Sequence, residues 1–488
     1  MPQISIVGAG LSGMVTALRL RERGCDVTLY EASSRLGGKA GADSNSGRYE
    51  EHGYHIFPAW YMNVWRLVDQ LGIRDHFIDC HDFAQLRPGQ FPHFRTLHDF
   101  TSARYFLRNL FSGVLSVPEM YLFFYSVLDL ASQPYRYRAL LDQISLTGFF
   151  RSRFYRTETV ADELQDLMLK GISVPSYIVS AMTTRAVMRF WMKNPLPMFR
   201  ILRGNLQEFW IWPLQRELER LGCDIRTGYC LTRLRINHRR VSSLEFDVGG
   251  TQREIDATKV VLAIPVEKLQ QLLDDEVYGI APGLSAVQHL RAEPMAALNL
   301  YLRSKLSSIP KAHVNLLDSR FGLSFIDVSQ IWTGYGNTVL NVIASDMISL
   351  RGLSEDQAAE ALIEDLGRYL PNIKSEIAEC VFKPHIEQPL FMNDVGAWQF
   401  RPKARTEIAN LYLAGDFCQS HIDLVSMEGA VTCGLEAAEA LRSDLEVGNP
   451  IEILKPSEYA RFLLLLAKLL LIPFAAIAKL ATLVFHSR

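Results

Sequence analysis

The chain has 488 residues, a formal net charge of −2, and a composition in which 48% of residues are hydrophobic and 21% are charged. A chain of this length is too long for one simple core, so we expect two or more folded units. The sequence has no basic block, which excludes the charge pattern of a nucleic-acid-binding protein and predicts no nucleic-acid partner. Seven cysteines occur without a C-x-x-C pair, which favours free thiols and predicts no metal site.

The first 31 residues predict a strand, a turn, a helix and a second strand. The run "QISIVGAG" is typical of a short buried strand, "SGMVTALRLRERG" of a helix that ends at Gly24, and "DVTLYE" of a second strand. Together these elements predict a βαβ unit. Because the first strand follows Met1 almost at once, we expect no signal or transit peptide.

The rest of the chain alternates between helical and sheet-forming pieces. Between Phe100 and about Arg220 the pattern is mostly helical, with one helix expected to begin near Thr159. The strand-rich runs "DIRTGYCLTRLRIN", "VSSLEFDV" and "REIDATKVVLAIP" follow, and a mixed segment then leads to a strand in "NLYLAGD" and a helix in "SMEGAVTCGLEAAEAL". Sheet-forming sequence thus occurs in three separated pieces, which predicts one domain that is interrupted twice.

A G-x-G-x-x-G pattern at Gly8, Gly10 and Gly13 lies between the first strand and the first helix. In this setting Gly8 permits a tight turn, Gly10 lets a pyrophosphate approach the backbone, and Gly13 lets the helix pack close to the strand. Free N–H groups at the helix start face the phosphates. Glu31, at the end of the second strand, can accept both hydroxyls of an adenosine ribose and disfavours the 2′-phosphate of NADP. These residues predict a dinucleotide site and leave FAD and NAD both open.

Three further stretches resemble elements of a flavoprotein superfamily. "EASSRLGGKA", with Arg35 and Lys39 in a second glycine turn, resembles the R-x-G-G element of flavin amine oxidases and carotenoid desaturases, which lies along the FAD pyrophosphate. "LYLAGDF" resembles their second FAD signature, in which the aspartate, here Asp416, bonds to the ribityl or phosphate end. "SMEGAV" begins a helix whose positive end would point at the flavin N1/O2 edge. The resemblance implies FAD as the cofactor.

The fold that this resemblance implies is α/β. It comprises a discontinuous Rossmann-type FAD-binding domain, an inserted α+β substrate domain and a C-terminal apolar helical tail. The predicted boundaries are 1–75, 223–276 and 399–445 for the three parts of the FAD-binding domain, 76–222 for a mainly helical, membrane-facing part of the substrate domain, 277–398 for its second part, and 450–488 for the tail.

Within the superfamily, the chain resembles plant- and cyanobacterial-type phytoene desaturases, with zeta-carotene desaturases as near relatives. "EEHGYHIFPAWYMNVWRLVDQLGI" is similar to their G-x-H-I-F-F-G-A-Y-P-N element, and "RFWMKN" with "RGNLQEFWIWPL" to their N-R-F and G-N-P-P-E-R-L segment. "DLVSMEGAV" is similar to L-A-S-M-E-G-A-V. The similarity runs from Ile4 to about Leu441. Two departures, Pro58-Ala59-Trp60 and Leu206-Gln207, fall on the substrate side and leave the exact substrate open.

The resemblance assigns roles to particular residues of this chain. Contacts to FAD are implied for Gly8, Gly10, Leu11, Ser12, Gly13, Glu31, Ala32, Arg35, Gly38, Lys39, Tyr54, His55, Ile56, Tyr61, Leu231, Gly415, Asp416 and Met427. Contacts to substrate are implied for Trp60 and Val425, and Arg189 is a candidate near flavin and substrate. Structural roles stay open for His55, as a buried hydrogen-bonded histidine, and for Arg189, as an ion-pair partner.

The resemblance implies dehydrogenation of a long apolar isoprenoid or polyene by hydride transfer to FAD. Amine oxidases carry an aromatic residue just before M-E-G-A and usually a lysine near the flavin, but "HIDLVS" has no such aromatic and "PMAALNLYL" has no lysine. Since the sequence shows no carboxylate pair and no nucleophile–histidine arrangement, we assign no certain catalytic residue. A polyene isomerase, a hydroxysqualene-type reductase and a flavin-bound membrane protein without turnover stay open as alternatives.

The segment from Phe462 to Phe485 is the most apolar in the chain. As a helix it would be about 36 Å long, which is long enough to cross a membrane. However, Lys468 and Lys479 interrupt the apolar run, and because they lie eleven residues apart they fall on one face. This pattern predicts a helix that lies in the membrane interface, bent at Pro473, with a helix packed on the protein's own core as the alternative.

The expected location is therefore the cytoplasmic face of a membrane, as a peripheral or monotopic protein. The aromatic-rich stretch from Tyr105 to Tyr125 is a candidate second membrane contact. The apolar substrate would then enter from the lipid, and a membrane quinone is a candidate electron acceptor.

Overall fold

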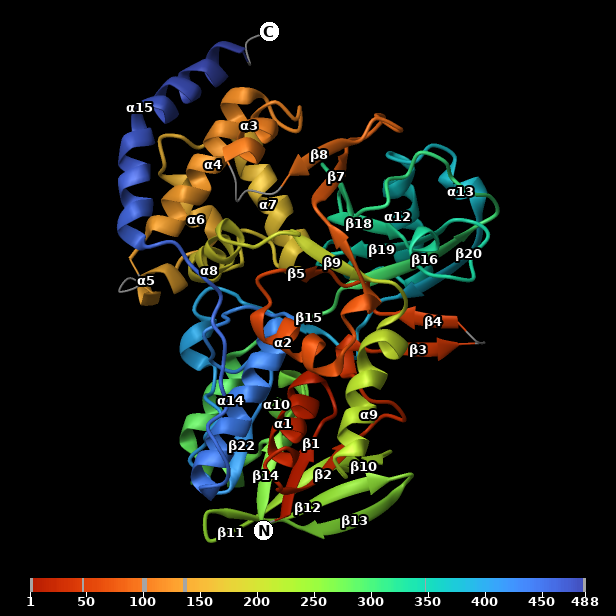
Figure 1. The fold of residues 1–488 in the computed structure, drawn as a ribbon, viewed down its shortest axis with the longest axis vertical. Helices are drawn as coiled ribbons and strands as arrows, with labels where there is room; N and C mark the ends of the chain where they lie inside the picture. The colour runs from red at the N-terminus through yellow and green to blue at the C-terminus, as the bar shows by residue number, and fades with distance from the viewer. Residues whose placement is uncertain (1–2, 46–47, 99–102, 135–137, 347, 486–488) are drawn as a thin grey trace.

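The computed structural model describes residues 3–45, 48–98, 103–134, 138–346 and 348–485. The molecule is elongated, with the N-terminal α/β region at one end and a helical region with the C-terminal helix at the other (Figure 1). An α/β fold with a Rossmann-type sheet and a long C-terminal apolar helix confirms the predicted fold class.

A five-stranded parallel sheet forms the end of the molecule that contains the N-terminus (Figure 1). Its order is β10-β2-β1-β14-β22, and each neighbouring pair is parallel. The strands are β1 (Gln3–Val7), β2 (Asp26–Glu31), β10 (Asp224–Thr227), β14 (Lys259–Leu262) and β22 (Leu411–Leu413). They come from three distant parts of the chain, as the three pieces of sheet-forming sequence predict.

Helices α1 (Leu11–Arg21) and α14 (Met427–Leu445) pack against each other beside this sheet. The hydroxyl of Ser12 donates to the carbonyl of Ala430 at 2.9 Å, and that of Thr16 donates to the carbonyl of Gly434 at 3.0 Å. A side chain on Gly434 would place its Cβ 2.5 Å from the Ser12 carbonyl, so the close approach requires glycine. These bonds join helices whose contacting residues are 418 positions apart in the sequence.

A seven-stranded sheet with the order β20-β16-β19-β18-β17-β7-β8 forms the other major β layer. Its strands are β7 (Asp82–Leu86), β8 (Arg95–His98), β16 (Ala296–Leu302), β17 (Val314–Leu316), β18 (Leu323–Asp327), β19 (Val339–Ala344) and β20 (Ile377–Lys383). Two strands of the segment expected to be mainly helical, β7 and β8, thus join strands from far along the chain. One face of the sheet packs against α12 (Glu355–Gly367) and α13 (Ile373–Glu376) in a shared apolar core.

Smaller elements connect these layers. The remaining strands are β3 (Ala42–Asn45), β4 (Arg48–Glu51), β5 (Phe57–Pro58), β6 (Phe77–Cys80), β9 (Phe199–Leu202), β11 (Cys230–Asn237), β12 (Arg240–Val248), β13 (Thr251–Asp256), β15 (Ala292–Glu293) and β21 (Leu390–Phe391). The remaining helices near the α/β region are α2 (Met62–Leu71), α9 (Trp212–Arg220), α10 (Val266–Leu272) and α11 (Asp275–Ile280).

The helical region lies at the far end of the molecule from the N-terminus (Figure 1). It consists of α3 (Ala103–Leu110), α4 (Val117–Ser132), α5 (Arg138–Asp142), α6 (Leu146–Arg151), α7 (Glu158–Ile172) and α8 (Ala181–Met192). Helix α7 begins one residue before the predicted start near Thr159, because Thr157 caps it by accepting a hydrogen bond from the N–H of Val160.

The C-terminal helix α15 (Arg461–Phe485) lies along α4, and Pro473 is inside it. The two lysines share a face, as predicted, but that face is turned to the protein. Lys468 forms an ion pair with Asp129 of α4, with 2.6 Å between Nζ and Oδ1, and Lys479 donates to the carbonyl of Arg156 at 2.6 Å. On this face, α15 has the arrangement of the alternative interpretation, a helix packed on the protein itself.

The opposite face of α15 is apolar and exposed. Its exposed side chains are Phe462, Leu463, Leu465, Leu466, Leu469, Leu470, Ile472, Phe474, Ile477, Leu480, Leu483 and Val484. An 18-residue window of the segment Arg461–Val484 has a mean hydropathy of 2.2, and only 17% of that window is buried, so by length and composition alone the helix could cross a membrane. The helix therefore combines a polar attachment to α4 with an uncovered apolar surface.

Candidate functional site

The first glycine turn connects β1 to α1 and leaves an open backbone surface at its tip. Gly8 has a φ of 101°, and a Cβ there would lie 2.4 Å from the Ala263 carbonyl. A Cβ on Gly13 would lie 1.9 Å from the Gly8 carbonyl, which explains how α1 starts so close to the strand. Gly10 has nothing within 4 Å of its Cβ position and lines the cavity described below. The turn can therefore receive a phosphate group against its backbone.

The second glycine turn packs directly onto the first. The N–H of Gly37 donates to the carbonyl of Ala9 at 2.8 Å, and Gly37 also forms an isolated bridge with Gly10. Arg35 donates from Nη1 to the Gly38 carbonyl at 3.1 Å and from Nε to Asp43 at 2.7 Å. The guanidinium thus holds the second turn in shape beside the first.

Glu31 lies at the end of β2 with its carboxylate fixed by backbone N–H groups. Oε2 accepts from the N–H of Ala9 at 2.7 Å, and Oε1 accepts from the N–H of Ser33 at 2.9 Å. Oε1 also accepts from the Ser33 hydroxyl at 2.9 Å. Because a carboxylate has about four acceptor positions, one position on Oε2 stays open to a ribose hydroxyl.

The two glycine turns border a cavity of about 910 Å³. The predicted FAD-contacting residues on its lining are Gly8, Gly10, Leu11, Ser12, Glu31, Ala32, Arg35, Gly38, Lys39, Tyr54, His55, Ile56, Tyr61, Gly415, Asp416 and Met427, together with the predicted substrate contact Val425. These residues come from chain segments far apart in sequence and meet around one space, which we call the cofactor cavity.

Three predicted residues, Gly13, Leu231 and Arg189, line neither the cofactor cavity nor the second cavity described below. Gly13 lies beneath the first turn, and Leu231 is half-buried on β11 in the three-stranded sheet. Arg189 of α8 lies outside both cavities. Its guanidinium pairs with Glu458 and donates to the carbonyls of Ala131 and Tyr459 at 3.0 and 2.9 Å. Arg189 is therefore an ion-pair partner in the structure, which is the structural role that the sequence left open. Its contacts hold the segment that leads into α15.

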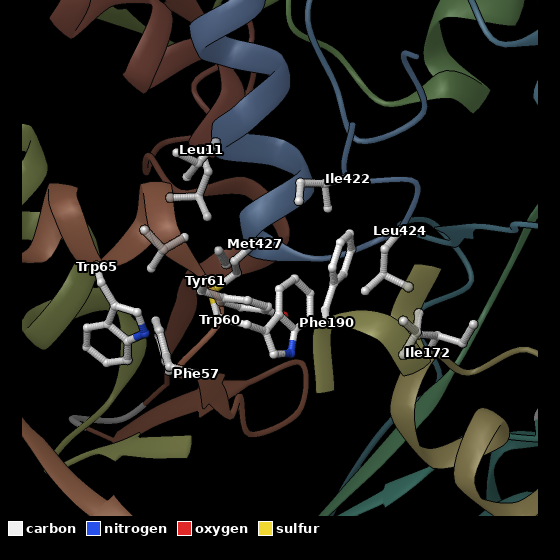
Figure 2. Close-up of a cluster of buried hydrophobic side chains, with 14 of the residues drawn as sticks. Leu11, Phe57, Trp60, Tyr61, Trp65, Ile172, Phe190, Ile422, Leu424 and Met427 are labelled. Carbon is white, nitrogen blue, oxygen red and sulfur yellow. The ribbon is translucent and has the colours of Figure 1, made fainter. Parts of the chain in front are cut away.

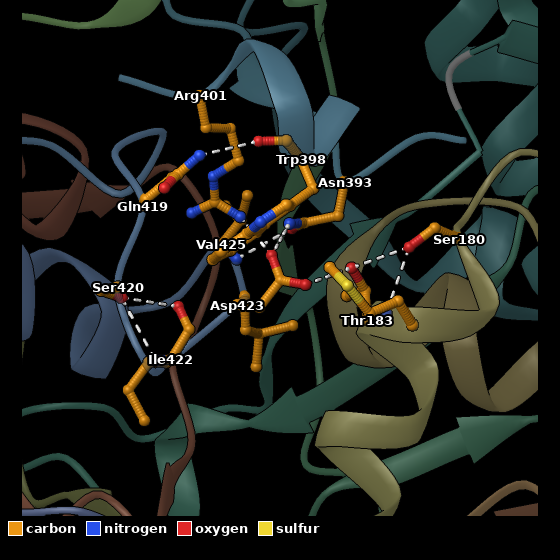
Figure 3. A network of polar contacts seen from close by, with 12 residues as sticks. Ser180, Thr183, Asn393, Trp398, Arg401, Gln419, Ser420, Ile422, Asp423 and Val425 are labelled. Carbon is orange, nitrogen blue, oxygen red and sulfur yellow. Dashed lines mark hydrogen bonds and ion pairs between the residues drawn. The ribbon is translucent and has the colours of Figure 1, made fainter. Parts of the chain in front are cut away.

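A buried ion pair between Arg401 and Asp423 holds the loop that contains Asp416 (Figure 3). Arg401 also donates to the carbonyls of Asp416, Phe417 and Cys418, at 2.8, 3.0 and 2.6 Å. The Asp416 side chain itself is half-buried, and desolvation raises its pKa, which the positive charges of Lys39 and Arg401 oppose. A polar network missed in the sequence therefore fixes the backbone on which this predicted FAD ligand sits.

The same network reaches the start of α14. Asn393 donates to Asp423 at 3.3 Å and accepts from the N–H of Val425 at 3.1 Å (Figure 3). Ser426 caps α14 by accepting from the N–H of Gly429 at 3.0 Å. The start of α14 lines the cofactor cavity, so its positive dipole end is available to an electron-rich group there.

His55 and Tyr61 line the cofactor cavity, and neither is ionised near neutral pH. Burial lowers the pKa of His55 to about 4, and its Nδ1 lies 2.9 Å from the Gly53 carbonyl. Burial raises the pKa of Tyr61. His55 is thus half-buried and hydrogen-bonded, which is close to the structural role that the sequence left open beside a chemical role.

A second cavity, of about 320 Å³, adjoins the cofactor cavity; we call it the apolar cavity. Ile56, Tyr61, Lys170, Gly171, Ile172, His313, Val425 and Ser426 line both. Trp60, the other predicted substrate residue, lines only the apolar cavity, where its ring centroid lies 4.6 Å from Tyr61 and 5.0 Å from Phe190 (Figure 2). Aromatic side chains of α4 and Leu471 of α15 complete the wall farther from the cofactor cavity.

Comparison with known proteins places this geometry in a family. Residues 11–442 match the flavin containing amine oxidoreductases. The chain is 26% identical to the 15-cis-phytoene desaturase of Solanum lycopersicum, over 91% of this chain and 78% of that protein, and 23% identical to the zeta-carotene desaturase of Synechocystis sp., over 90% and 97%.

Solved structures share the fold at lower identity. Putrescine oxidase bound to putrescine superposes with a TM-score of 0.70 at 16% identity, over 91% of this chain and 99% of that one. Cyclohexylamine oxidase from Brevibacterium oxydans superposes with a TM-score of 0.65 at 16% identity, with the same coverage.

The cavity's glycine turns, fixed carboxylate and helix start suit the phosphates, ribose and ring of a flavin dinucleotide. The match over residues 11–442, together with this site, shows that the chain is an FAD-binding enzyme of the flavin containing amine oxidoreductase family.

Proposed function

We propose that this oxidoreductase dehydrogenates a long apolar isoprenoid or polyene substrate at FAD. The observation that carries the proposal is the apolar cavity, which meets the cofactor cavity beside Tyr61 and Val425 and extends to Leu471 of α15. Phytoene and zeta-carotene desaturases are among its relatives, which supports the same substrate class. When bound, FAD supplies a two-electron oxidant that accepts a hydride from carbon, and loss of a neighbouring proton completes the double bond.

The protein's own part is to orient the chain and to exclude water. Trp60 and Trp191 form an aromatic wall of the apolar cavity, with ring centroids 6.5 Å apart, and Phe190 packs against Trp60 at 5.0 Å. Val425, on the loop fixed by Asn393, stands where the two cavities meet. These side chains would hold a polyene against the flavin.

The uncovered face of α15 supports a route for such a substrate. An apolar helix surface of this kind suits a helix that lies in a membrane interface. Because Leu471 and Tyr121 both line the apolar cavity, and the Tyr121 hydroxyl donates to the Leu471 carbonyl at 3.3 Å, the cavity's far end lies beside the helix that would contact lipid. A quinone in the same membrane is the electron acceptor that we propose.

The test is anaerobic incubation of the purified holoenzyme with 15-cis-phytoene in detergent micelles, followed by flavin absorbance and product spectra. Dehydrogenation bleaches one flavin for each new double bond. A change of double-bond geometry without bleaching would instead show the isomerase. Reoxidation of pre-reduced flavin by a hydroxylated isoprenoid would show the reductase, and an unchanged flavin and substrate would contradict the proposal.

A further inference from the structure

Two amide side chains lie next to each other on the wall of the apolar cavity. Strands β7 and β17 are parallel neighbours in which Gln85 is the register partner of Asn315. Because side chains alternate along a strand, both amides share a face with Phe83 and His313, and all four line the apolar cavity. The intervening residues face the core shared with α12. The sheet thus presents a polar strip to an otherwise apolar space.

Helix α7 presents a second polar strip to the same cavity. Glu163, Asp166 and Lys170 recur at a spacing of three and four residues, which places them on one helix face, and all line the cavity. Lys170 pairs with Asp166, with 2.5 Å between Nζ and Oδ2, and also donates to the Leu316 carbonyl at 2.7 Å. Since Lys170 and His313 also line the cofactor cavity, the polar strips begin where the two cavities meet.

The two polar strips together carry little net charge. Lys170 is balanced by Asp166, and burial lowers the pKa of His313 to about 3, so this imidazole is neutral. Burial and the nearby Asp166 carboxylate raise the pKa of Glu163 to about 7, which the side chain of Gln85 opposes through a hydrogen bond. The polar strips therefore suit an uncharged group better than a phosphate, which needs cations in excess.

Two amide oxygens in the polar strip of β7 and β17 lack a hydrogen-bond partner among the described residues. Oε1 of Gln85 and Oδ1 of Asn315 are buried without a hydrogen bond among the described residues, and so is Nδ1 of His313. Gln85 is 2% exposed. A buried polar atom left unpaired costs roughly 1–3 kcal/mol, so such atoms in a cavity indicate a ligand group or water that completes them.

We propose that the apolar cavity takes a substrate that bears a hydroxyl group, and that Gln85 and Asn315 accept the hydrogen bond from this hydroxyl. The inference rests on the proposed function, because it specifies which long apolar molecules the site receives. A pure hydrocarbon leaves both amide oxygens unpaired, whereas an isoprenoid alcohol pairs at least one of them. The two amides are specificity-determining residues, outside the reacting carbons.

The test compares three probes of one carbon skeleton on the FAD-loaded full chain: geranylgeraniol, the hydrocarbon in which a methyl replaces its CH₂OH group, and geranylgeranylamine. Binding is followed by tryptophan fluorescence, because Trp60 and Trp191 line the cavity. We expect the alcohol to bind about tenfold more tightly than the hydrocarbon, as one well-formed buried hydrogen bond allows.

Each other outcome has a distinct meaning. Equal affinities for alcohol and hydrocarbon would overturn the hydroxyl inference and leave the proposed function standing. Tighter binding of the amine would overturn it in favour of a cationic substrate. If none of the probes bound, the proposed function and this inference would both fail.

Variants then locate the effect. Gln85→Leu with Asn315→Leu should remove the preference for the alcohol, since leucine offers no acceptor and changes the shape of the wall little. Asn299→Leu is the matched control, because Asn299 is a buried amide of the same sheet with an unpaired nitrogen but lines neither cavity. Asn315→Leu alone, at a half-buried position, supplies a milder change if the double variant loses FAD. A preference that survives in these variants would contradict the assignment.

Discussion

Lys468 and Asp129 form an ion pair, 2.6 Å between Nζ and Oδ1, that joins the C-terminal helix α15 to α4. Asp129 is buried and also accepts from the hydroxyl of Tyr155 at 2.5 Å and pairs with Arg153 at 3.2 Å. One carboxylate on α4 therefore holds groups from two other parts of the helical region.

We expect Asp129→Asn to destabilise the protein more than Lys468→Met. The first leaves two buried or half-buried cations with a neutral partner, at a cost of about 3 kcal/mol, while the second leaves Asp129 with Arg153 and Tyr155. Urea unfolding measures the difference, and limited trypsin cleavage reports release of α15. An equal fall in the free energy of unfolding in both variants would contradict this expectation, because the contact with Lys468 would then account for the whole contribution of Asp129 to stability.

The exposed face of α15 predicts how the protein binds membranes. Since Lys468 and Lys479 are turned to the protein, binding should depend on apolar area and change little when neutral vesicles are replaced by anionic ones. Truncation after Glu458 should abolish sedimentation with vesicles and leave FAD bound. Strong dependence on anionic lipid, or binding by the truncated protein, would place the main contact elsewhere.

Glu31 predicts a specific loss of cofactor affinity. Glu31→Gln should weaken FAD binding by about tenfold or more, because charged hydrogen bonds are worth roughly 1.5–3 kcal/mol and the amide also meets the Ala9 and Ser33 N–H groups with one donor nitrogen. The ratio of FAD to protein after gel filtration measures it. Asp26→Asn, at the exposed start of the same strand, is the control. Full retention of FAD by Glu31→Gln would refute the ribose role.

The buried carboxyl of Glu51 predicts a pH dependence of stability. Burial raises its pKa from 4.5 to about 8, so between these values the folded protein binds more protons than the unfolded chain. The free energy of unfolding therefore falls as pH rises through this window, by up to about 1.4 kcal/mol per pH unit from this group. Glu51→Gln, which can still accept from the Leu206 N–H, should make the decline shallower.

Urea unfolding at about pH 6 and about pH 8 checks this slope. Glu428 has its pKa raised to about 8 and contributes in the same direction, so the Glu51→Gln variant keeps part of the decline. Glu452→Gln, with a side chain 66% exposed, is the control and should leave the slope unchanged. A slope that Glu51→Gln does not alter would contradict the assignment.

The dinucleotide turn could be predicted from the sequence because its geometry depends on a few adjacent residues. Gly8 must adopt a positive φ, and Gly13 must have no side chain, so the pattern itself encodes the turn. The Asp416 loop was also recognisable as a signature. Arg401 and Asp423, which hold that loop, carry no local pattern, and their pairing depends on the tertiary fold.

The polar wall of the apolar cavity could not be predicted in the same way. Glu163, Asp166 and Lys170 form the usual pattern of a solvent-facing helix side, and only the fold turns that side to a cavity. The partners of the α15 lysines could not be predicted for the same reason. A helical wheel shows that Lys468 and Lys479 share a face, but the partner of that face, Asp129, lies more than 300 residues earlier.

Gly171 tests the central claim that the two cavities form one catalytic site. It lines both cavities, and its Cβ position has nothing within 4 Å, so a side chain fits without distorting the backbone and fills the junction. The measurement is the rate of anaerobic flavin reduction by the apolar substrate in Gly171→Leu, with FAD content and reduction by dithionite as controls. The account predicts that substrate reduction falls at least about tenfold while both controls are unchanged, a barrier increase of about 1.4 kcal/mol or more. An undiminished rate of substrate reduction would contradict it.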